Sequence, residues 1–359
     1  MALVGIEPGF WRGKRVFLTG HTGFKGSWLA LWLHELGVTV TGYAIGVPTS
    51  PSLYEVAGVE AGLTSVRGDV RDLAALTRAM RAAHPEIVVH MAAQSLVRRS
   101  YEQPVETFET NVTGTVNVLE AVRSIGDVRV VLNVTSDKCY LNRDWEWGYR
   151  EVEPLGGDDP YSASKACSEL VTTAYRQSFF ASEGPAIASA RAGNVIGGGD
   201  WSSDRLVPDV MRSAIDGSTM IVRNPHHVRP WQHVLNPLSG YLQLVQRLWD
   251  DRAMSEAWNF GPPESDARPV GWIVRRLAEL WGDEIDIRFR EKTDGDADEA
   301  RVLKLDSTRA HERLGWRPSW TLAQALEATI AWYRAFRSNE DVRELALGQI
   351  AAFESDAPS

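Results

Sequence analysis

The chain has 359 residues, which is enough for one large α/β unit or for two lobes around a full core. Its formal net charge of −9 argues against nucleic acid as a main partner, and its two cysteines are too few for a disulfide framework. No run approaches about 18 apolar residues and the start lacks a signal pattern, so we expect a cytoplasmic protein with no membrane partner.

The first expected unit is a strand over 15–18, a glycine loop, and a helix over 27–36. A strand, loop and helix in this order are the context that a dinucleotide fingerprint requires. Glycines at this spacing allow a tight turn and a close approach to a pyrophosphate, and the helix N-terminus adds amide donors and partial positive charge. The loop residues expected to contact a dinucleotide are Gly20, Thr22, Gly23, Phe24, Lys25 and Gly26.

The second strand, over 38–44, does not end in the acidic residue that would grip a ribose 2′-hydroxyl. Lys25 in the glycine loop is a candidate to reach a 2′-phosphate, so these residues leave NAD and NADP both open. After the third strand, over 64–67, Asp69 is suited to cap a helix that starts at Arg71.

Reactive side chains gather after the apolar, β-branched strand over 130–134. Thr135 stands at the carboxyl end of that strand, and Asp137 and Lys138 lie just beyond it, in the crevice where α/β sheets place their chemistry. An adjacent Asp-Lys pair is more often a solvated surface turn. The position of this pair at the end of a strand favours a functional site.

Tyr161 and Lys165 follow at i and i+4 on a helix that begins after Pro160. This spacing points both side chains to one face. A neighbouring ammonium favours the phenolate, so we expect Lys165 to lower the pKa of Tyr161 from about 10 and make it a base. The same spacing is common by chance, with a solvated lysine as the alternative, and the preceding glycine loop favours the catalytic interpretation.

Together the glycine loop, Thr135, Tyr161 and Lys165 resemble the extended short-chain dehydrogenase/reductases that act on nucleotide sugars. Further matching blocks are residues 90–97, 111–115 and 191–195. The resemblance favours NAD as the cofactor, without excluding NADP. It implies an adenine-edge contact at Asp69 and Val70 and further cofactor contacts at Ala92, Ala93, Gln94, Asn111, Tyr161 and Lys165.

Residues 20–29, 135–140 and 147–161 resemble the CDP-glucose branch of the nucleotide-sugar 4,6-dehydratases. That branch carries Asp-Lys where the dTDP-glucose and GDP-mannose branches carry Asp-Glu. The resemblance implies that Tyr161 takes the proton from the sugar 4-hydroxyl while Thr135 hydrogen-bonds this oxygen. Asp137 is then the candidate acid for the 6-hydroxyl, and Lys138 is the candidate base at C5. The sequence supports the two residues acting as a pair more strongly than it supports which of them is the acid and which the base.

The alternation of strands and helices over 15–191 predicts an α/β fold with a doubly wound parallel (Rossmann) sheet. A smaller mixed α/β lobe is expected to interleave with it. We assign 1–195 plus about 232–262 to the Rossmann domain and about 196–231 plus 263–354 to the nucleotide-sugar lobe, with a late strand over 258–260 returning to the sheet. Residues 351–359 are expected to be a frayed tail.

The resemblance places the nucleotide diphosphate of the substrate, expected to be CDP-glucose, after the sixth strand. Its predicted ligands are Asn194, Arg229 and Arg301, because a guanidinium can grip two phosphate oxygens at once. No metal is expected. The helices over 105–125 and 162–181 are the face implied for a homodimer or tetramer. The alternatives are a nucleotide-sugar 4-epimerase, a dehydratase of another nucleotide hexose, and a non-catalytic nucleotide-sugar-binding protein.

Overall fold

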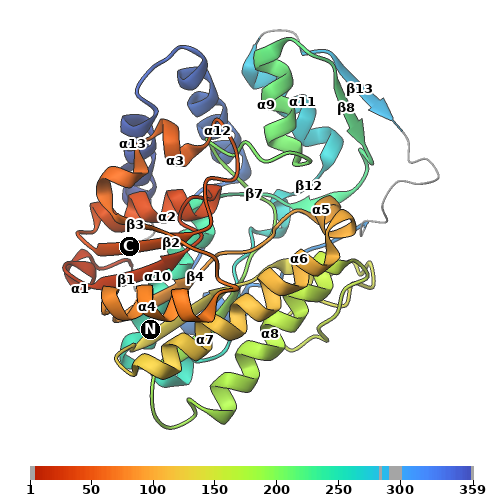
Figure 1. Ribbon diagram of the computed structural model, residues 1–359. Coiled ribbons are helices and arrows are strands. Elements are labelled where there is room, and N and C mark those ends of the chain that lie inside the picture. Colours follow the sequence, from red (N-terminus) through yellow and green to blue (C-terminus); the bar gives the residue numbers. More distant parts are fainter. Residues whose placement is uncertain (1–4, 283–284, 291–300, 357–359) are drawn as a thin grey trace.

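The computed structural model describes residues 5–282, 285–290 and 301–356, and a central sheet of seven parallel strands organises them (Figure 1). The strand order is β11-β6-β5-β4-β1-β2-β3. These strands are β1 (Arg15–Thr19), β2 (Thr39–Ala44), β3 (Thr64–Arg67), β4 (Ile87–His90), β5 (Val130–Val134), β6 (Ala186–Arg191) and β11 (Ala257–Asn259). β4 and β5 are buried along their whole length, as expected of apolar strands covered on both faces.

Helices cover both faces of this sheet. α4 (Leu73–Ala83) and α7 (Gly114–Ile125) contribute to the core on one face, and α2 (Phe24–Glu35) and α10 (Leu235–Asp250) contribute to the core on the other. α8 (Pro160–Ser178) packs beside α7. The predicted α/β fold with a doubly wound parallel sheet is therefore confirmed.

A second group of short elements lies away from the central sheet, at the upper right of Figure 1. It consists of α9 (Leu206–Asp216), β8 (Met220–Arg223), β9 (Val228–Pro230), β12 (Ala267–Pro269), α11 (Val270–Trp281) and β13 (Ile287–Arg290). β8 pairs with β13 in parallel, and β9 pairs with β12 antiparallel. Two short strands, β7 (Val195–Ile196) and β10 (Gln232–His233), pair with each other. The chain then returns to the sheet, where β11 pairs with β6 as expected.

The C-terminal region forms two helices, α12 (Leu322–Arg337) and α13 (Val342–Ser355). The expectation of a frayed tail from 351 is wrong for residues 351–355, because Phe353 is 1% exposed and packs edge-on against Trp32 of α2. Residues 357–359 lie outside the described residues. α13 thus packs on a helix of the sheet although its sequence was assigned to the smaller lobe, and the division into two lobes stays a prediction.

Across the described ranges, no helix is long and apolar enough to cross a bilayer. The same ranges hold no group of three or more His, Cys, Asp and Glu side chains arranged to bind a metal ion.

Candidate active site

The glycine loop forms a backbone cradle between β1 and α2. Gly20 has a φ of +76°, and a Cβ there would stand 2.7 Å from the backbone nitrogen of Ala92. A Cβ on Gly26 would overlap the carbonyl oxygen of Gly20. Gly23 precedes the first turn of α2 and provides no side-chain cap, so the amides at that helix end remain available to an anion. The cradle therefore fits the pyrophosphate of a dinucleotide.

Lys25 points toward Asp137 and Lys165, away from the end of β2 where a 2′-phosphate would lie. Its Nζ donates to the hydroxyl of Tyr241 at 3.4 Å. Burial, together with the charges of Arg205 and Lys165, lowers the pKa of Lys25 to about 7, and only the charge of Asp137 opposes this. The expectation that Lys25 could reach a 2′-phosphate is therefore wrong, because the buried side chain extends to α10.

Asp69 does not cap the helix that follows it. The cap of α4 is Asp72, whose side chain accepts from the backbone N–H of Ala75, and α4 begins at Leu73. Asp69 instead accepts from Arg71 at 2.6 Å, and this hydrogen bond holds the pKa of Asp69 below its ordinary value. The capping alternative is wrong, and the adenine-edge contact of Asp69 and Val70 stays a prediction.

The side chain of Asn111 makes its hydrogen bonds to neighbouring protein groups. It lies in a π-helical turn (Glu109–Thr113) and is 2% exposed. Its Oδ1 accepts from the backbone N–H of Gln94, and its Nδ2 donates to the carbonyl of Gln94 and to Ser164 of α8, all within 2.9 Å. Asn111 therefore holds the loop after β4 against α8, and any effect on a cofactor would pass through Ala92, Ala93 and Gln94.

The Asp137-Lys138 pair lies beyond the end of β5, as predicted. Asp137 is 1% exposed, and its Oδ1 accepts from the Ser136 hydroxyl at 3.0 Å and lies 4.0 Å from Lys138 Nζ. Its Oδ2 is buried without a hydrogen-bond partner in the described part of the chain. Gly193 leaves the room for this carboxylate, since a Cβ there would overlap Oδ2. Asp137 thus keeps one buried oxygen without a hydrogen-bond partner among the described residues.

Tyr161 and Lys165 share the buried face of α8, as predicted, but the pKa of Tyr161 moves against expectation. Burial raises the pKa of Tyr161 to about 12, with a hydrogen bond to the Ser136 side chain opposing the rise and the charge of Asp137 adding to it. Burial also lowers the pKa of Lys165 to about 8, although the charge of Glu169 opposes this. The expected lowering of the pKa of Tyr161 by Lys165 is therefore wrong, because removal of the phenol from water dominates and raises this pKa.

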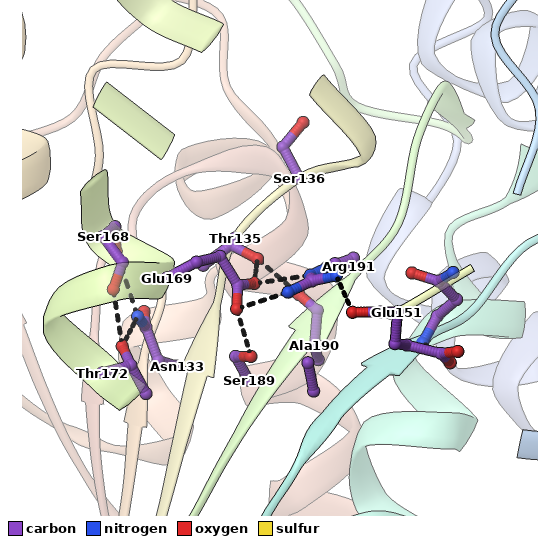
Figure 2. Close-up of polar contacts among 12 residues, drawn as sticks. Asn133, Thr135, Ser136, Glu151, Ser168, Glu169, Thr172, Ser189, Ala190 and Arg191 are labelled. Atoms are coloured by element: carbon purple, nitrogen blue, oxygen red, sulfur yellow. Dashed lines mark hydrogen bonds and ion pairs between the residues drawn. The ribbon is translucent and has the colours of Figure 1, made fainter. Parts of the chain in front are cut away.

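The hydroxyl beside Tyr161 belongs to Ser136. Thr135 instead donates to Glu169 Oε1 at 2.5 Å, and Figure 2 shows Ser136 pointing away from that contact. Glu169 lies eight residues beyond Tyr161 on α8, roughly 12 Å along the helix axis. Sequence reasoning missed Ser136. Alternation along the strand was the available signal, because Asn133 and Thr135 share the face that meets α8.

Of the residues predicted for the diphosphate, Asn194 lies just beyond β6 and Arg229 lies in the second group of elements. Asn194 follows β6 with a φ of +41°. The guanidinium of Arg229, in β9, donates to the carbonyls of Val228 and Arg301 at 3.0 and 3.3 Å. The structure therefore brings Arg229 and the backbone of Arg301 together, whereas residues 298–300 of the predicted Arg301 segment lie outside the described residues.

A family model described as GDP-mannose 4,6 dehydratase matches residues 17–329. The chain belongs to this dehydratase family. A CDP-glucose 4,6-dehydratase from Salmonella typhimurium is 51% identical over 356 residues, covering 98% of this chain and 99% of the relative. A dTDP-glucose 4,6-dehydratase from Streptomyces griseus is 30% identical over 332 residues, covering 90% and 95%.

Solved structures agree with this family membership. A dTDP-glucose 4,6-dehydratase from Streptomyces venezuelae, with NAD and TYD bound, has a TM-score of 0.78 and 27% identity, covering 91% of this chain and 99% of that one. A UDP-glucose 4-epimerase from Thermotoga maritima has a TM-score of 0.77 but 22% identity, covering 89% and 99%, and this likeness shows the fold alone. The predicted superfamily, an extended short-chain dehydrogenase/reductase, is confirmed.

Proposed function

We propose that this protein is a CDP-glucose 4,6-dehydratase, which converts CDP-D-glucose to CDP-4-keto-6-deoxy-D-glucose with NAD as its cofactor. The observation that carries the proposal is the 51% identity to the Salmonella enzyme along nearly the whole of both chains. The site supports it, because the buried Asp137 lies beside Lys138 within the same crevice as Tyr161.

Oxidation at C4 is assigned to Tyr161 and Ser136. Tyr161 takes the proton of the 4-hydroxyl, and the Ser136 hydroxyl, which hydrogen-bonds Tyr161, orients that oxygen. The cationic Lys165 on the next turn stabilises the phenolate that must form. NAD, when held by the glycine cradle between β1 and α2, would supply the hydride acceptor for C4 and the hydride donor for C6, and C5 would regain a proton as C6 is reduced, so no net oxidant is needed.

Elimination of water is assigned to Asp137 and Lys138. A ketone at C4 makes the C5 hydrogen acidic, so one group can remove it while another protonates the leaving 6-hydroxyl. The unpaired Oδ2 of Asp137 is suited to the acid, and Lys138 Nζ, at 4.0 Å from the other oxygen, is suited to the base. The division of roles within this coupled pair remains part of the proposal. At the far end of the substrate, Asn194, Arg229 and Arg301 are proposed to hold the diphosphate.

An epimerase is the second candidate function. Epimerases share the Tyr and Lys and a neighbouring hydroxyl but need no acid and base at C5 and C6. The buried Asp137 with an unsatisfied oxygen is costly unless a ligand completes it, and this favours the dehydratase.

The substrate assignment predicts that only CDP-glucose, among CDP-, dTDP-, GDP- and UDP-glucose, is converted efficiently to a product lighter by one water. NAD should not be consumed in this conversion, because the same cofactor returns its hydride. Mass spectrometry of the product, with the nicotinamide absorbance recorded in parallel, checks both points. Conversion of dTDP-glucose with CDP-glucose ignored would reject the assignment, and epimerised product without loss of water would favour the second candidate.

The assignment of Ser136 predicts that Ser136→Ala slows C4 oxidation by about a hundredfold. This is the smallest rate loss usually seen when a group that takes part in proton transfer is removed. Thr135→Val should slow C4 oxidation less and should mainly lower stability, because its hydroxyl serves Glu169 and its loss costs about 1–3 kcal/mol. Single-turnover rates and thermal unfolding separate the two effects. The reverse order of rates would return the role to Thr135.

We further propose that the protein forms a homodimer through α6 (Pro104–Phe108) and α8. Val105 and Leu170, at 69% and 59% exposed, face outward from these helices, and Phe108 and Cys167 line a hollow between them. Val105→Glu combined with Leu170→Glu should then yield monomers in light scattering after gel filtration. Ile221→Glu, at an exposed apolar position on β8, is the matched control and should leave the mass unchanged. A wild-type monomer would contradict the proposal.

A further inference from the structure

A buried ion pair that the assigned chemistry does not use lies beneath the reactive groups. Glu169 and Arg191 have side-chain exposures of 1% and 4%. Arg191 donates from Nε to Glu169 Oε1 and from Nη2 to Oε2, both at 2.9 Å. Thr135 and Ser189 donate to the same two oxygens at 2.5 and 2.6 Å (Figure 2). Glu169 therefore ties α8 to the ends of β5 and β6.

The pair also reaches the segment that follows the Asp137-Lys138 turn. Arg191 Nη1 donates to the hydroxyl of Tyr140 at 2.7 Å, and its guanidinium lies over the Tyr140 ring. The Tyr140 hydroxyl in turn donates to Asn259 Oδ1 at 2.7 Å. One hydrogen-bonded cluster thus spans α8, β5, β6, β11 and the turn of the assigned acid and base.

Such a cluster is weak evidence for stability, because the cost of removing two charges from water can exceed their mutual attraction. The pair is nevertheless kept ionised. Burial alone would raise the pKa of Glu169, but the charge and hydrogen bonds of Arg191, with those of Ser189 and Thr135, hold it below its ordinary value. Keeping Glu169 charged in a buried position costs desolvation free energy. Because Glu169 lies one helical turn beyond Lys165, we expect its charge to act on the site.

We propose that Glu169 is a positioning residue for C4 oxidation: with Arg191 as its counter-ion, it fixes the end of β5 against α8 and keeps Lys165 cationic. This inference rests on the proposed function for the step it affects. It assigns Glu169 no contact with substrate or cofactor, since both of its carboxylate oxygens are already engaged by protein donors.

The electrostatic part of the proposal concerns the surroundings of Lys165. Glu169 faces it from α8, Cys139 from the turn after β5, His90 from the end of β4 and Lys25 from α2. Burial lowers the pKa of His90 to about 3, so its ring is neutral at working pH, and burial raises the pKa of Cys139, so its thiol is neutral as well. Glu169 is then the negative charge that opposes the effect of burial on the pKa of Lys165.

The decisive variant is Glu169→Gln, which keeps the size of the side chain and removes its charge. We expect kcat for C4 oxidation to fall by about a hundredfold, because a misplacement of the reacting groups by about 1 Å has an effect of this size. KM and the Kd for NAD should change little. Without the carboxylate the pKa of Lys165 falls further, so the alkaline limb of the kcat profile should move to lower pH. Lysine side-chain NMR, assigned with Lys165→Met, should show the same downward shift without any turnover.

Two further variants keep the test decisive if Glu169→Gln folds poorly. Glu169→Asp retains the charge on a shorter stem, so it should lower kcat but leave the alkaline limb in its wild-type place. Thr172→Val removes another buried hydrogen bond between α8 and β5, the one from Asn133 at 2.7 Å, and should lower the melting temperature without changing kcat or the pH profile.

Glu169→Gln or Glu169→Asp with a wild-type kcat would overturn the positioning role, and an unmoved Lys165 titration in Glu169→Gln would overturn the electrostatic one. A wild-type protein that converts none of the four sugar nucleotides would instead overturn the proposed function. The NMR titration of Lys165 would still report on the ion pair in that case.

Discussion

Tyr161→Phe should slow C4 oxidation by about a hundredfold to ten-thousandfold, the usual loss when a positioned acid or base is removed. The ring keeps its packing, so NAD and sugar nucleotide should bind nearly as well as to the wild type. Because burial raises the pKa of Tyr161 to about 12, the unaided phenol is a poor base, and we expect the bound cofactor and substrate to be needed for its ionisation. Single-turnover reduction of enzyme-bound NAD by CDP-glucose measures this step.

Tyr175→Phe is the matched control for this variant. Tyr175 lies on the same helix, and its hydroxyl donates to Glu120 at 2.7 Å, on the side of α8 that meets α7. Its loss should change stability by about 1 kcal/mol and leave the oxidation rate unchanged. Near-normal oxidation by Tyr161→Phe would show that another group takes the proton.

Most of the sheet could be predicted from the sequence because its signals are local. β3 and β5 were predicted with their observed bounds, and for β5 the signal is a short β-branched run that defines a strand without reference to the rest of the chain. The shared face of Tyr161 and Lys165 follows from helical periodicity alone. The position of Asp137-Lys138 follows from the rule that parallel sheets place their chemistry at the carboxyl ends of strands.

The direction of individual side chains could not be predicted in the same way. Lys25 turns toward Tyr241, which is 216 residues away in sequence, so its orientation depends on packing that no local pattern contains. Nothing in the local sequence distinguished Glu169 from any other polar residue on a helix. Its partner Arg191 comes from β6, so the ion pair depends on the tertiary fold. Phe353 was misjudged although Val342, Ala346, Ile350 and Phe353 recur at helical spacing, and this apolar stripe was the available sign that α13 is packed.

Lys138→Met and Asp137→Asn should separate the two halves of the reaction. Methionine keeps an unbranched apolar stem and loses the amine, and asparagine keeps the shape of the side chain and loses the acid. Neither group takes part in removing the 4-hydroxyl proton, so oxidation should proceed while elimination slows by about a hundredfold or more. Both variants should therefore accumulate reduced nicotinamide and a bound 4-keto sugar nucleotide, whereas Tyr161→Phe should accumulate neither.

Solvent deuterium distinguishes the two members of the pair. If Lys138 removes the C5 proton, exchange of that hydrogen should nearly cease in Lys138→Met. Asp137→Asn should retain exchange, because its base is intact and only departure of the 6-hydroxyl is impaired. The 4.0 Å between Asp137 Oδ1 and Lys138 Nζ places the two groups in contact, so each variant removes the partner of the other group. Exchange at the wild-type rate in Lys138→Met would make Lys138 a cation that holds Asp137 in place, and the base would then have to come from another side chain of the crevice.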